Sequence, residues 1–370
     1  MSRWTDQSER LLSGLEKCEA IYRPTNFWAP GLRKLSADLD AHGLESFKSW
    51  PGASTWFYPV YGSGFSNATI KTTFEHARSV NPRTREAWMS GALNGSWEAR
   101  RDFDAARLAW QQARWPFDIE GHGESRVGRP PQRYRMTGSD DVGWGRPYLN
   151  YLLCLAALSR HVEAEPTRFL EIGGGFGTLG EIVLQRNESA QYVNLDIPPL
   201  VTVAGYYLSE LFGQDKVMLP ADAPEHGPIE VAHSACLPNW RLPDIVGPFD
   251  VFTNTYSFQE MEPDVVDHYV QKVADLEVRY VVSYNSILGK PKRVEGVEGG
   301  VLDPVTSARI VEMFQRRGYR LLQAYRDPLV VSAAEIAVLE RRQPAGRSRH
   351  RVAQGRPRQA ESPRAREMRS

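Results

Sequence analysis

The run FLEIGGGFGTLGE holds the residues whose types and spacing most plainly allow chemistry. A short apolar stretch containing Glu171 is followed by Gly173, Gly175 and Gly177, and a helix-forming stretch begins at once. Glycine adopts tight backbone dihedrals and lets a ligand approach the main chain, and the start of a helix offers free N–H groups. The run predicts a strand, a ligand-binding turn and a helix. A glycine-rich turn without a ligand is the alternative.

Two cofactors suit such a turn, and Glu171 distinguishes between them. Residues 175–180 satisfy GxGxxG, so a dinucleotide such as NAD stays open. A carboxylate before the first glycine, however, can face the positively charged amino-acid end of S-adenosylmethionine and would lie poorly beside a pyrophosphate. Asp196, nineteen residues after Gly177, ends the next expected strand and can bind the ribose hydroxyls of either cofactor. The residues therefore favour S-adenosylmethionine.

The segment SFQEM supplies the candidate catalytic residue, Glu260. It follows the fourth expected strand, at the edge of the sheet where ligand crevices form. Methyl transfer to a hydroxyl requires the oxygen to be held in line and helped to lose its proton. A carboxylate flanked by Phe258 and Met261 could have a raised pKa and act as this base. The alternative is a carboxylate at a helix start, favoured by the helix dipole.

Further candidates lie in loops. In such a fold the adenine lies across the tip of the third strand, and the stretch AHSACLPNW falls at that place. Ser234, Ala235 and Cys236 are therefore expected to line the adenine site; an ordinary strand-end loop is the alternative. His122 and Glu124, in GHGESRVG, are expected to cover the acceptor or to form a lid. Indole faces stack on pyranose rings. The tryptophans in glycine-rich loops are therefore candidates for acceptor contact: Trp50, Trp56 and Trp144.

These residues must be positioned by an α/β domain, which we expect over residues 148–342. Strand-like and helical stretches alternate there, as in a sheet covered by helices on both faces. The expected strands are Arg168–Ile172, Gln191–Leu195, a third whose tip falls at AHSACLPNW, Phe249–Thr253 as the fourth, Tyr280–Tyr284, Tyr319–Tyr325 and Glu335–Glu340. The loop between the last two is too short for a parallel crossover. The pattern predicts a Rossmann-like, mostly parallel sheet closed by a C-terminal antiparallel hairpin, as in class I methyltransferases.

The flanking regions differ from this domain in composition. Residues 1–147 are mainly helical and rich in tryptophan, with helices expected over Ser8–Ala20, Leu32–Ala41 and Arg83–Arg114, and we expect them to form an acceptor-binding, lid or dimerisation region. Residues 343–370 contain almost no apolar side chains and are expected to be disordered.

Charge and cysteine content exclude several classes of function. Between Arg341 and Ser370 stand ten Arg and two Glu, so the rest of this electrically neutral chain carries a net charge of −8. Nucleic-acid binding needs a basic face, so nucleic acid is not an expected partner. The three cysteines are scattered, and no metal-ligand spacing occurs. The start has no signal-peptide pattern and no run could span a bilayer, so we expect a cytoplasmic protein without membrane contact. A homodimer stays open.

The runs FLEIGGGFG, YVNLDIPP and FDVFTNTYSFQEM together resemble S-adenosylmethionine-dependent methyltransferases. More narrowly, the chain is similar to the sugar O-methyltransferases of polyketide deoxysugar tailoring and surface-glycan clusters, over roughly residues 120–342. The resemblance implies that Glu171 and the loop glycines contact the cofactor, as do Asp196 and Ile197. It places Glu260 on the acceptor side.

The expected function is therefore S-adenosylmethionine-dependent O-methylation of a sugar hydroxyl, in a deoxysugar of a natural product or a glycan. Beside His122, Glu124 and Trp144, the expected acceptor contacts are Tyr256 and Gln259, which flank the SFQEM motif or lie in it. Methylation of another small acceptor, a phenol or a carboxylate, is the first alternative. An NAD-dependent oxidoreductase is the second.

Overall fold

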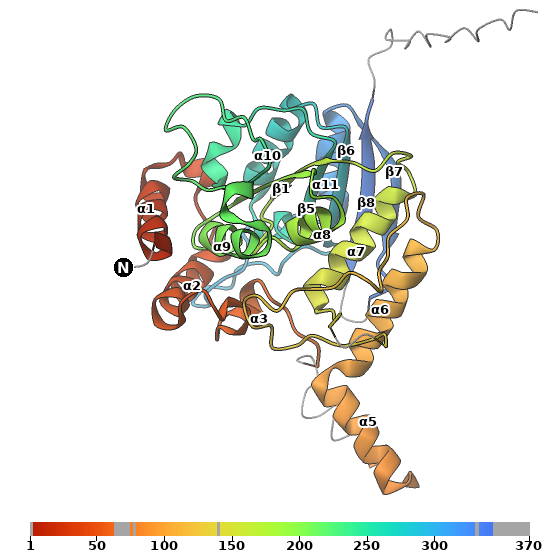
Figure 1. Ribbon diagram of the computed structural model, residues 1–370. Coiled ribbons are helices and arrows are strands. Elements are labelled where there is room, and N and C mark those ends of the chain that lie inside the picture. Colours follow the sequence, from red (N-terminus) through yellow and green to blue (C-terminus); the bar gives the residue numbers. More distant parts are fainter. Residues whose placement is uncertain (1–2, 63–74, 77–78, 139–140, 330–332, 343–370) are drawn as a thin grey trace, which may run out of the picture.

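A computed structural model describes residues 3–62, 75–76, 79–138, 141–329 and 333–342, so the tail at 343–370, expected to be disordered, lies outside the described residues. One eight-stranded sheet forms the centre of the molecule, in the order β3-β4-β2-β1-β5-β6-β8-β7 (Figure 1). Its strands are β1 Arg168–Ile172, β2 Gln191–Asp196, β3 Val217–Met218, β4 Ser234–Pro238, β5 Val251–Thr255, β6 Tyr280–Ser286, β7 Tyr319–Arg326 and β8 Ala334–Arg341.

The first six strands pair in parallel, and only β8 runs in the opposite direction. β8 pairs antiparallel with both β6 and β7, so the final strand lies between them. The short link between β7 and β8 permits this hairpin but no parallel crossover. The expected α/β fold, a mostly parallel Rossmann-like sheet with a closing antiparallel hairpin, is confirmed. β3 is an additional short edge strand that the sequence did not predict.

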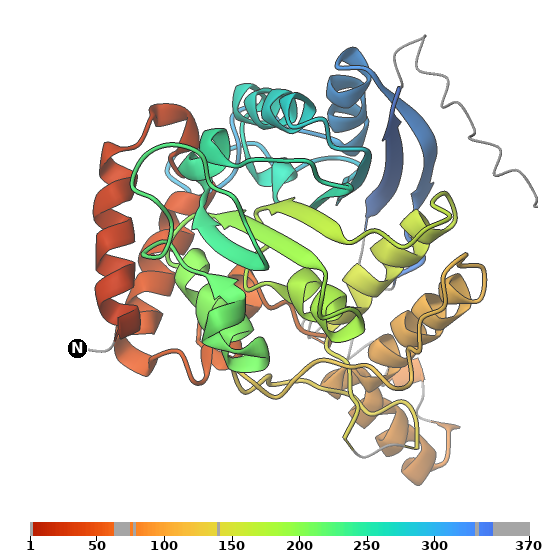
Figure 2. The ribbon, with the colours of Figure 1, turned by 45° about the horizontal axis from the view of Figure 1, so that its top comes forward.

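Helices cover both faces of the sheet (Figure 2). α7 Arg146–Ser159, α8 Thr178–Arg186 and α9 Leu200–Phe212 lie on one face, and α10 Pro263–Asp275 and α11 Ser307–Arg316 lie on the other. Successive strand residues point to opposite faces. In β1, Phe169 therefore packs with the first set of helices and Leu170 with the second.

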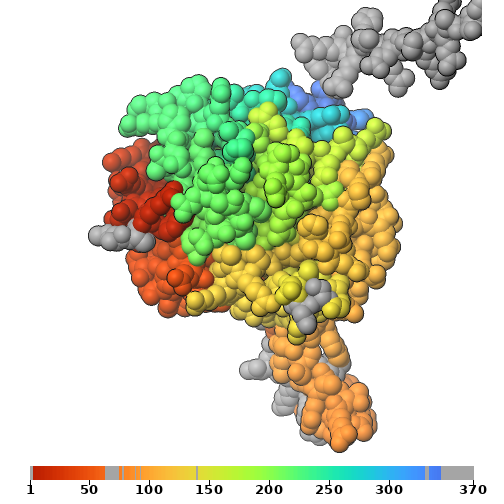
Figure 3. All heavy atoms as spheres, viewed as in Figure 1, coloured from red at the N-terminus to blue at the C-terminus, as the bar shows by residue number. Residues whose placement is uncertain are grey.

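Most N-terminal elements pack against the first of these layers, whereas η1 Ala20–Tyr22 packs against α10 on the other face. The N-terminal elements are α1 Arg3–Lys17, η1, α2 Trp28–His42, η2 Phe47–Ser49, α3 Ala53–Trp56, α5 Pro82–Asn94 and α6 Ser96–Trp110. The helix expected over Arg83–Arg114 is in fact two, because Gly95 adopts a left-handed φ of 78° between α5 and α6. α5 projects from the body of the molecule (Figure 3).

One hydrophobic core joins the N-terminal region to the sheet. Leu35, Phe47 and Tyr58 are buried in the same cluster as Leu152 of α7 and Tyr207 of α9. The N-terminal region is thus fixed against the sheet and its helices rather than hinged beside them. In the described part of the chain, no helix is long and apolar enough to cross a membrane.

Candidate functional site

A cavity of about 350 Å³ opens at the carboxyl edge of the parallel strands. Parallel strands present their carboxyl ends on one side of a sheet, and ligands bind in the crevice outside those ends. The loops after β1, β2 and β5 form one wall of the cavity, and η1, α2 and α3 approach from the N-terminal region. The cavity therefore combines two parts of the chain that lie far apart in sequence.

The glycine loop after β1 forms the floor of the cavity. Gly173 and Gly175 line it, with φ of 72° and 58°. A Cβ on Gly175 would meet nothing within 4 Å, so its main chain faces open space. Gly177 does not line the cavity; it caps α8 with a φ of 92°. The prediction of a strand, a tight turn and a helix is confirmed, with two of the three named glycines exposed to a ligand.

Asp196 at the end of β2 ties this loop to the neighbouring strand. Its Oδ2 accepts a hydrogen bond from the Gly175 amide at 2.7 Å, and its Oδ1 accepts one from the Ile197 amide at 2.7 Å. Both Asp196 and Ile197 line the cavity, as expected. Burial raises the pKa of Asp196 to about 7, although the two amides lower it. Each carboxylate oxygen keeps a second acceptor position for a ligand hydroxyl.

Glu171 does not reach the cavity, contrary to the expected direct contact with a cofactor. Its carboxylate is fully buried and accepts hydrogen bonds from Tyr151 at 2.7 Å and Tyr192 at 2.5 Å. A Cβ on Gly174 would stand 2.5 Å from Oε2 of Glu171, so the carboxylate lies directly beneath the loop. Burial raises the pKa of Glu171 to about 7, and the two tyrosines lower it. Glu171 supports the loop from below.

Two asparagine side chains at the cavity each have a carbonyl oxygen that accepts no hydrogen bond from the described residues. Asn239, just after β4, donates through Nδ2 to the Tyr22 carbonyl and the Tyr269 hydroxyl, both at 2.8 Å. Its Oδ1, like Oδ1 of Asn150 on α7, is buried and has no hydrogen-bond partner among the described residues. Unpaired buried acceptors are costly and mark positions where a donor from a ligand is expected.

The opposite end of the cavity centres on Glu260, in η6 Phe258–Glu260. Its Oε2 accepts a hydrogen bond from Nε1 of Trp28 at 2.9 Å, and its Oε1 lies 3.0 Å from Nζ of Lys290. Burial raises the pKa of Glu260, and Lys290 lowers it. The carboxylate in the first turn of α10 is Asp264, so Glu260 is not the helix-start carboxylate of the alternative interpretation.

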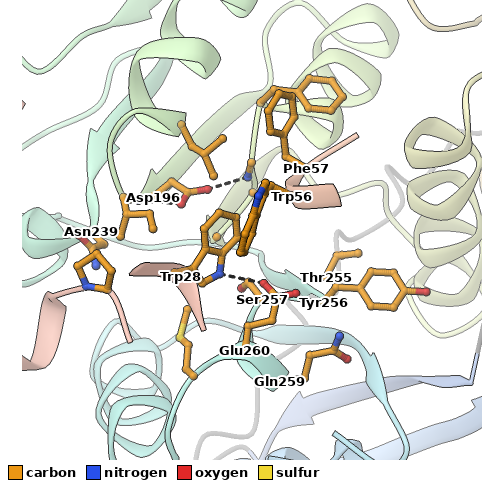
Figure 4. A pocket seen from close by; sticks show the side chains of 18 of the residues that line it. Trp28, Trp56, Phe57, Asp196, Asn239, Thr255, Tyr256, Ser257, Gln259 and Glu260 are labelled. Carbon is orange, nitrogen blue, oxygen red and sulfur yellow. Dashed lines mark hydrogen bonds between the residues drawn. The ribbon is translucent and has the colours of Figure 1, made fainter. Parts of the chain in front are cut away.

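Two tryptophans from the N-terminal region stand in the middle of the cavity. The rings of Trp28 and Trp56 lie 5.3 Å apart at an angle of 41°. Figure 4 shows them side by side, with Asp196 and Asn239 to one side and Tyr256 and Gln259 to the other. Trp56 was an expected acceptor contact. Trp50 was another, but it is buried away from the cavity and donates to the Gly43 carbonyl at 2.9 Å.

Tyr256 and Gln259 both line the cavity, and their contact with an acceptor stays a prediction. Tyr256 has a φ of 62°, which is unfavourable for a residue with a Cβ and common at functional positions. Gln259 is held by two hydrogen bonds. Its backbone N–H donates to Oδ1 of Asn285, and its side-chain Oε1 accepts from the backbone N–H of Ser286 at 2.5 Å. The chain after β5 is therefore fixed in an unusual conformation at this edge of the sheet.

The candidates around the third strand were wrong in position. Ser234 and Ala235 begin β4 and pair with Tyr192 and Val193 of β2, whereas Pro238 pairs with Asp196 at the ligand edge. Both side chains, and Cys236 with them, are buried inside the sheet. The residue of this stretch that reaches the cavity is Asn239. The stretch AHSACLPNW does reach the cavity, but β4 starts at Ser234, five residues before Asn239. The residues that were predicted therefore lie at the start of the strand, whereas the ligand edge is at its end.

The loop candidates His122, Glu124 and Trp144 also lie away from the cavity. His122 hydrogen-bonds through Nδ1 to the Asp118 carbonyl at 2.8 Å. Trp144 is fully buried against Phe103 and donates to the His122 carbonyl at 3.0 Å. None of the three lines the cavity, so the structure does not place them with the other acceptor candidates.

Glu124 belongs to a buried charged cluster around Lys48. Nζ of Lys48 lies 2.7 Å from Glu124 and donates to the Tyr207 hydroxyl at 2.9 Å, and that hydroxyl donates to Glu181 at 2.7 Å. The ring of Phe176, inside the glycine loop, lies 5.0 Å from the same Nζ. Burial raises the pKa of Glu181 to about 7, with Lys48 lowering it. The cluster fixes the glycine loop against the N-terminal region.

The prediction that no metal is required remains a prediction. Within the part of the chain that the structure describes, no group of three or more His, Cys, Asp or Glu side chains could hold a metal ion. The charged groups at the cavity are instead distributed one by one along its walls, such as Arg23, Arg146, Asp196, Glu260 and Lys290.

No family model matches the sequence, and no curated protein matches it. Among solved structures, the chain is similar to a magnesium protoporphyrin IX methyltransferase from Synechocystis PCC 6803 with bound SAM, at 14% identity, 48% coverage of this chain, 70% of the other, and a TM-score of 0.34. A mitomycin 7-O-methyltransferase gives 14%, 87%, 75% and 0.36 in the same order. The N,N-8-amino-8-demethyl-D-riboflavin dimethyltransferase of Streptomyces davawensis gives 11%, 86%, 72% and 0.37. At such TM-scores, function has to be judged from the chain's own residues.

Proposed function

We propose that this protein is an S-adenosylmethionine-dependent O-methyltransferase whose acceptor is a sugar hydroxyl. One observation carries the proposal: a single cavity joins an open glycine loop and Asp196 at one end to Glu260 and two indoles at the other. The first set of residues suits a nucleoside cofactor, and the second suits a hydroxylated acceptor. Their union in one cavity is what a group transfer between the two requires.

The cofactor end fits S-adenosylmethionine in three respects. The main chain of Gly175 leaves room for a ligand, Asp196 has acceptor capacity for ribose hydroxyls, and Oδ1 of Asn239 is free to accept from an adenine amino group. Oδ1 of Asn150 supplies another acceptor, as a cationic amino group would need. Bound there, the cofactor supplies an electrophilic methyl group. None of the contacts requires a pyrophosphate.

The acceptor end supports a hydroxyl nucleophile held by aromatic rings. Trp28 and Trp56 offer indole faces, which pack well against the apolar faces of sugar rings. Glu260 is positioned by two donors, Trp28 and Lys290, and each carboxylate oxygen still has a lone pair for the acceptor hydroxyl. Burial raises its pKa, which strengthens it as a proton acceptor. Glu260 therefore takes the proton that the hydroxyl loses.

The proposal is tested by incubating the protein with [methyl-¹³C]-S-adenosylmethionine and three acceptor sets: methyl glycosides of deoxysugars, phenols and carboxylic acids. We expect a new O–¹³CH₃ resonance on a glycoside. Labelled product from the phenols alone would replace the sugar by a phenol as acceptor. If labelled product appears in none of the three sets although S-adenosylhomocysteine binds, then methyl transfer to these acceptor classes is refuted.

The role of Glu260 is tested with the same assay. Glu260→Gln should lower kcat by about 100-fold or more, the lower end of what a general base contributes. The affinity for S-adenosylhomocysteine should change by less than about threefold, because the cofactor end is untouched. Asp264→Asn, which alters the neighbouring carboxylate in the first turn of α10, is the control and should keep wild-type turnover. Unchanged turnover in Glu260→Gln would remove it as the base.

A further inference from the structure

A segment of the connection between β6 and α11, residues 287–303, exposes four large apolar side chains. We call it the rim segment. Leu288, Val294, Val297 and Leu302 are 77%, 62%, 59% and 60% exposed. They are four of the ten large apolar residues that are exposed in the described part of the chain. Single exposed apolar residues are ordinary, but several in one short segment mark a surface that binds something.

The rim segment is fixed beside the acceptor end of the cavity at three points. Lys290 lines the cavity and pairs with Glu260 at 3.0 Å. Glu298 pairs with Arg33 at 2.6 Å, on the same helix as Trp28. The amides of Leu302 and Asp303 donate to Glu262 at 2.9 and 3.1 Å. The exposed apolar side chains thus belong to a segment that is continuous with the cavity wall.

The fold of the segment turns these side chains outward. Gly289, Gly296, Gly299 and Gly300 all have φ between 73° and 90°, which folds the chain back on itself. A Cβ on Gly300 would stand 2.8 Å from Cα of Arg293, so the two arms of the segment touch. Val301 fills the inside of this fold and is fully buried, while its neighbour Leu302 points to solvent. The outward face is therefore a property of the folded segment.

The size of the cavity indicates what this face contacts. A volume of about 350 Å³ lies near the lower end of the range of about 300–1,000 Å³ that holds one drug-sized ligand. A nucleoside cofactor is itself a ligand of drug size, so the cavity can enclose little of an acceptor beyond its reacting ring. Any further part of the acceptor must leave the cavity at the acceptor end, where the rim segment lies.

We infer that the acceptor is amphiphilic: its hydroxyl-bearing ring enters the cavity, and an attached alkyl or aryl group lies along Leu288, Val294, Val297 and Leu302. This inference rests on the proposed function and names the acceptor class more closely. Contact with these four side chains removes apolar surface from water, at about 25 cal/mol per Å². The acceptor is thereby selected by its apolar group as well as by its ring.

The test uses octyl and methyl β-D-glucopyranoside as probes, titrated below the micelle concentration into the protein saturated with S-adenosylhomocysteine. We expect the octyl glucoside to bind at least ten times more tightly than the methyl glucoside. The double variant Val294→Ser/Val297→Ser should lose most of this advantage. The control variant Leu93→Ser/Leu108→Ser changes exposed apolar residues on α5 and α6 and should keep it.

The outcomes separate this inference from the proposed function. Equal affinity for both glucosides, or an octyl advantage that survives in the rim variant, overturns the inference. So does a rim variant that changes only the oligomeric state in light scattering, or only the binding to phosphatidylcholine vesicles, because a second copy or a lipid surface would then cover the segment. Failure of S-adenosylhomocysteine to bind the wild-type protein would count against the proposed function instead.

Discussion

The two ends of the cavity are built in different ways. At the cofactor end, Gly175, Asp196 and Ile197 follow two adjacent parallel strands, and backbone amides bind the carboxylate directly. At the acceptor end, Glu260 meets Trp28 across 232 positions of sequence, and both of its oxygens are bound by side chains. The first end is a property of the sheet. The second exists only because the N-terminal region packs on it.

This difference indicates how the two ends respond to change. A sheet edge is specified by strand pairing, which many residues share, so the cofactor end is sensitive mainly to what occupies the loop itself. The acceptor end depends on single side chains brought together by tertiary packing. Substitutions at the first end should change cofactor affinity, whereas substitutions at the second should change turnover. The following variants test that separation, from the largest expected effect to the smallest.

Filling the space in front of the glycine loop should have the largest effect on binding. Gly175→Leu places a side chain where the wild-type loop meets nothing within 4 Å, so the affinity for S-adenosylhomocysteine should fall by about 100-fold or more, as measured by calorimetry. Gly318→Leu is the matched control, because Gly318 also has a left-handed φ and open space but lies in the turn before β7. Equal losses in both variants would mean that backbone strain, not lost space, is the cause.

Removing one carboxylate oxygen at the end of β2 should weaken the cofactor by less. Asp196→Asn leaves one acceptor for the Gly175 and Ile197 amides, and hydrogen bonds to charged groups contribute about 1.5–3 kcal/mol, so Kd should rise about 10- to 100-fold. Asp250→Asn is the control: Asp250 also accepts from two amides, at Thr167 and Arg168, but at the opposite edge of the sheet. A Kd that responds equally to both would contradict a specific role for Asp196.

At the acceptor end, Trp28→Phe should lower turnover without changing cofactor affinity. The variant keeps an aromatic ring but removes the N–H that orients Glu260. We expect kcat to fall about tenfold, the equivalent of about 1.4 kcal/mol in the barrier. Trp50→Phe removes the same kind of N–H from a buried tryptophan that lies away from the cavity, and it serves as the control. If Trp28→Phe weakened S-adenosylhomocysteine binding as much as it lowered kcat, the two ends would not be independent.

The smallest effect concerns the buried cluster around Lys48, which fixes the glycine loop against the N-terminal region. Because the pKa of Glu181 is raised to about 7 in the folded protein, this group binds its proton more tightly when folded than when unfolded. Its contribution to stability is therefore complete below the unfolded value, near pH 4.5, and is lost as the pH rises through about 7. Glu181→Gln cannot lose a proton, so its Tm relative to wild type should increase by a few degrees between pH 5 and pH 8.

Differential scanning calorimetry of both proteins across that range measures this difference. Glu210→Gln, at an exposed position of α9, should show no such trend. A constant Tm difference for Glu181→Gln would mean that Glu181 is already ionised at pH 5, and that Lys48 neutralises it.

The sequence predicted the sheet well because local patterns determine it. Arg168–Ile172 is an apolar run bounded by a turn, and its strand has the predicted bounds. Helix ends carry local signals as well: α9 ends at Phe212, where Gly213 follows. The antiparallel hairpin was predictable from loop length alone. Each of these elements carries its own signal within a few residues.

The acceptor end was only partly predictable, because its contacts are not local. Glu260 was identified from its place after a strand, but nothing near Trp28 in sequence indicates that its indole binds that carboxylate. Lys290 lies in a glycine-rich connection and was missed for the same reason. Asn239 was present in the motif that was singled out, and a correct start of β4 would have found it.

The most direct test of the account is calorimetric titration of the purified protein with S-adenosylhomocysteine and, in parallel, with NAD. The cavity joins an open glycine loop and Asp196 to the unpaired Oδ1 atoms of Asn150 and Asn239, acceptors that suit the ribose, the amino group and the adenine of S-adenosylhomocysteine. We therefore predict micromolar binding of S-adenosylhomocysteine and no binding of NAD. Binding of NAD without binding of S-adenosylhomocysteine would contradict the account, and would show that the GxGxxG spacing of residues 175–180 is the functional signal.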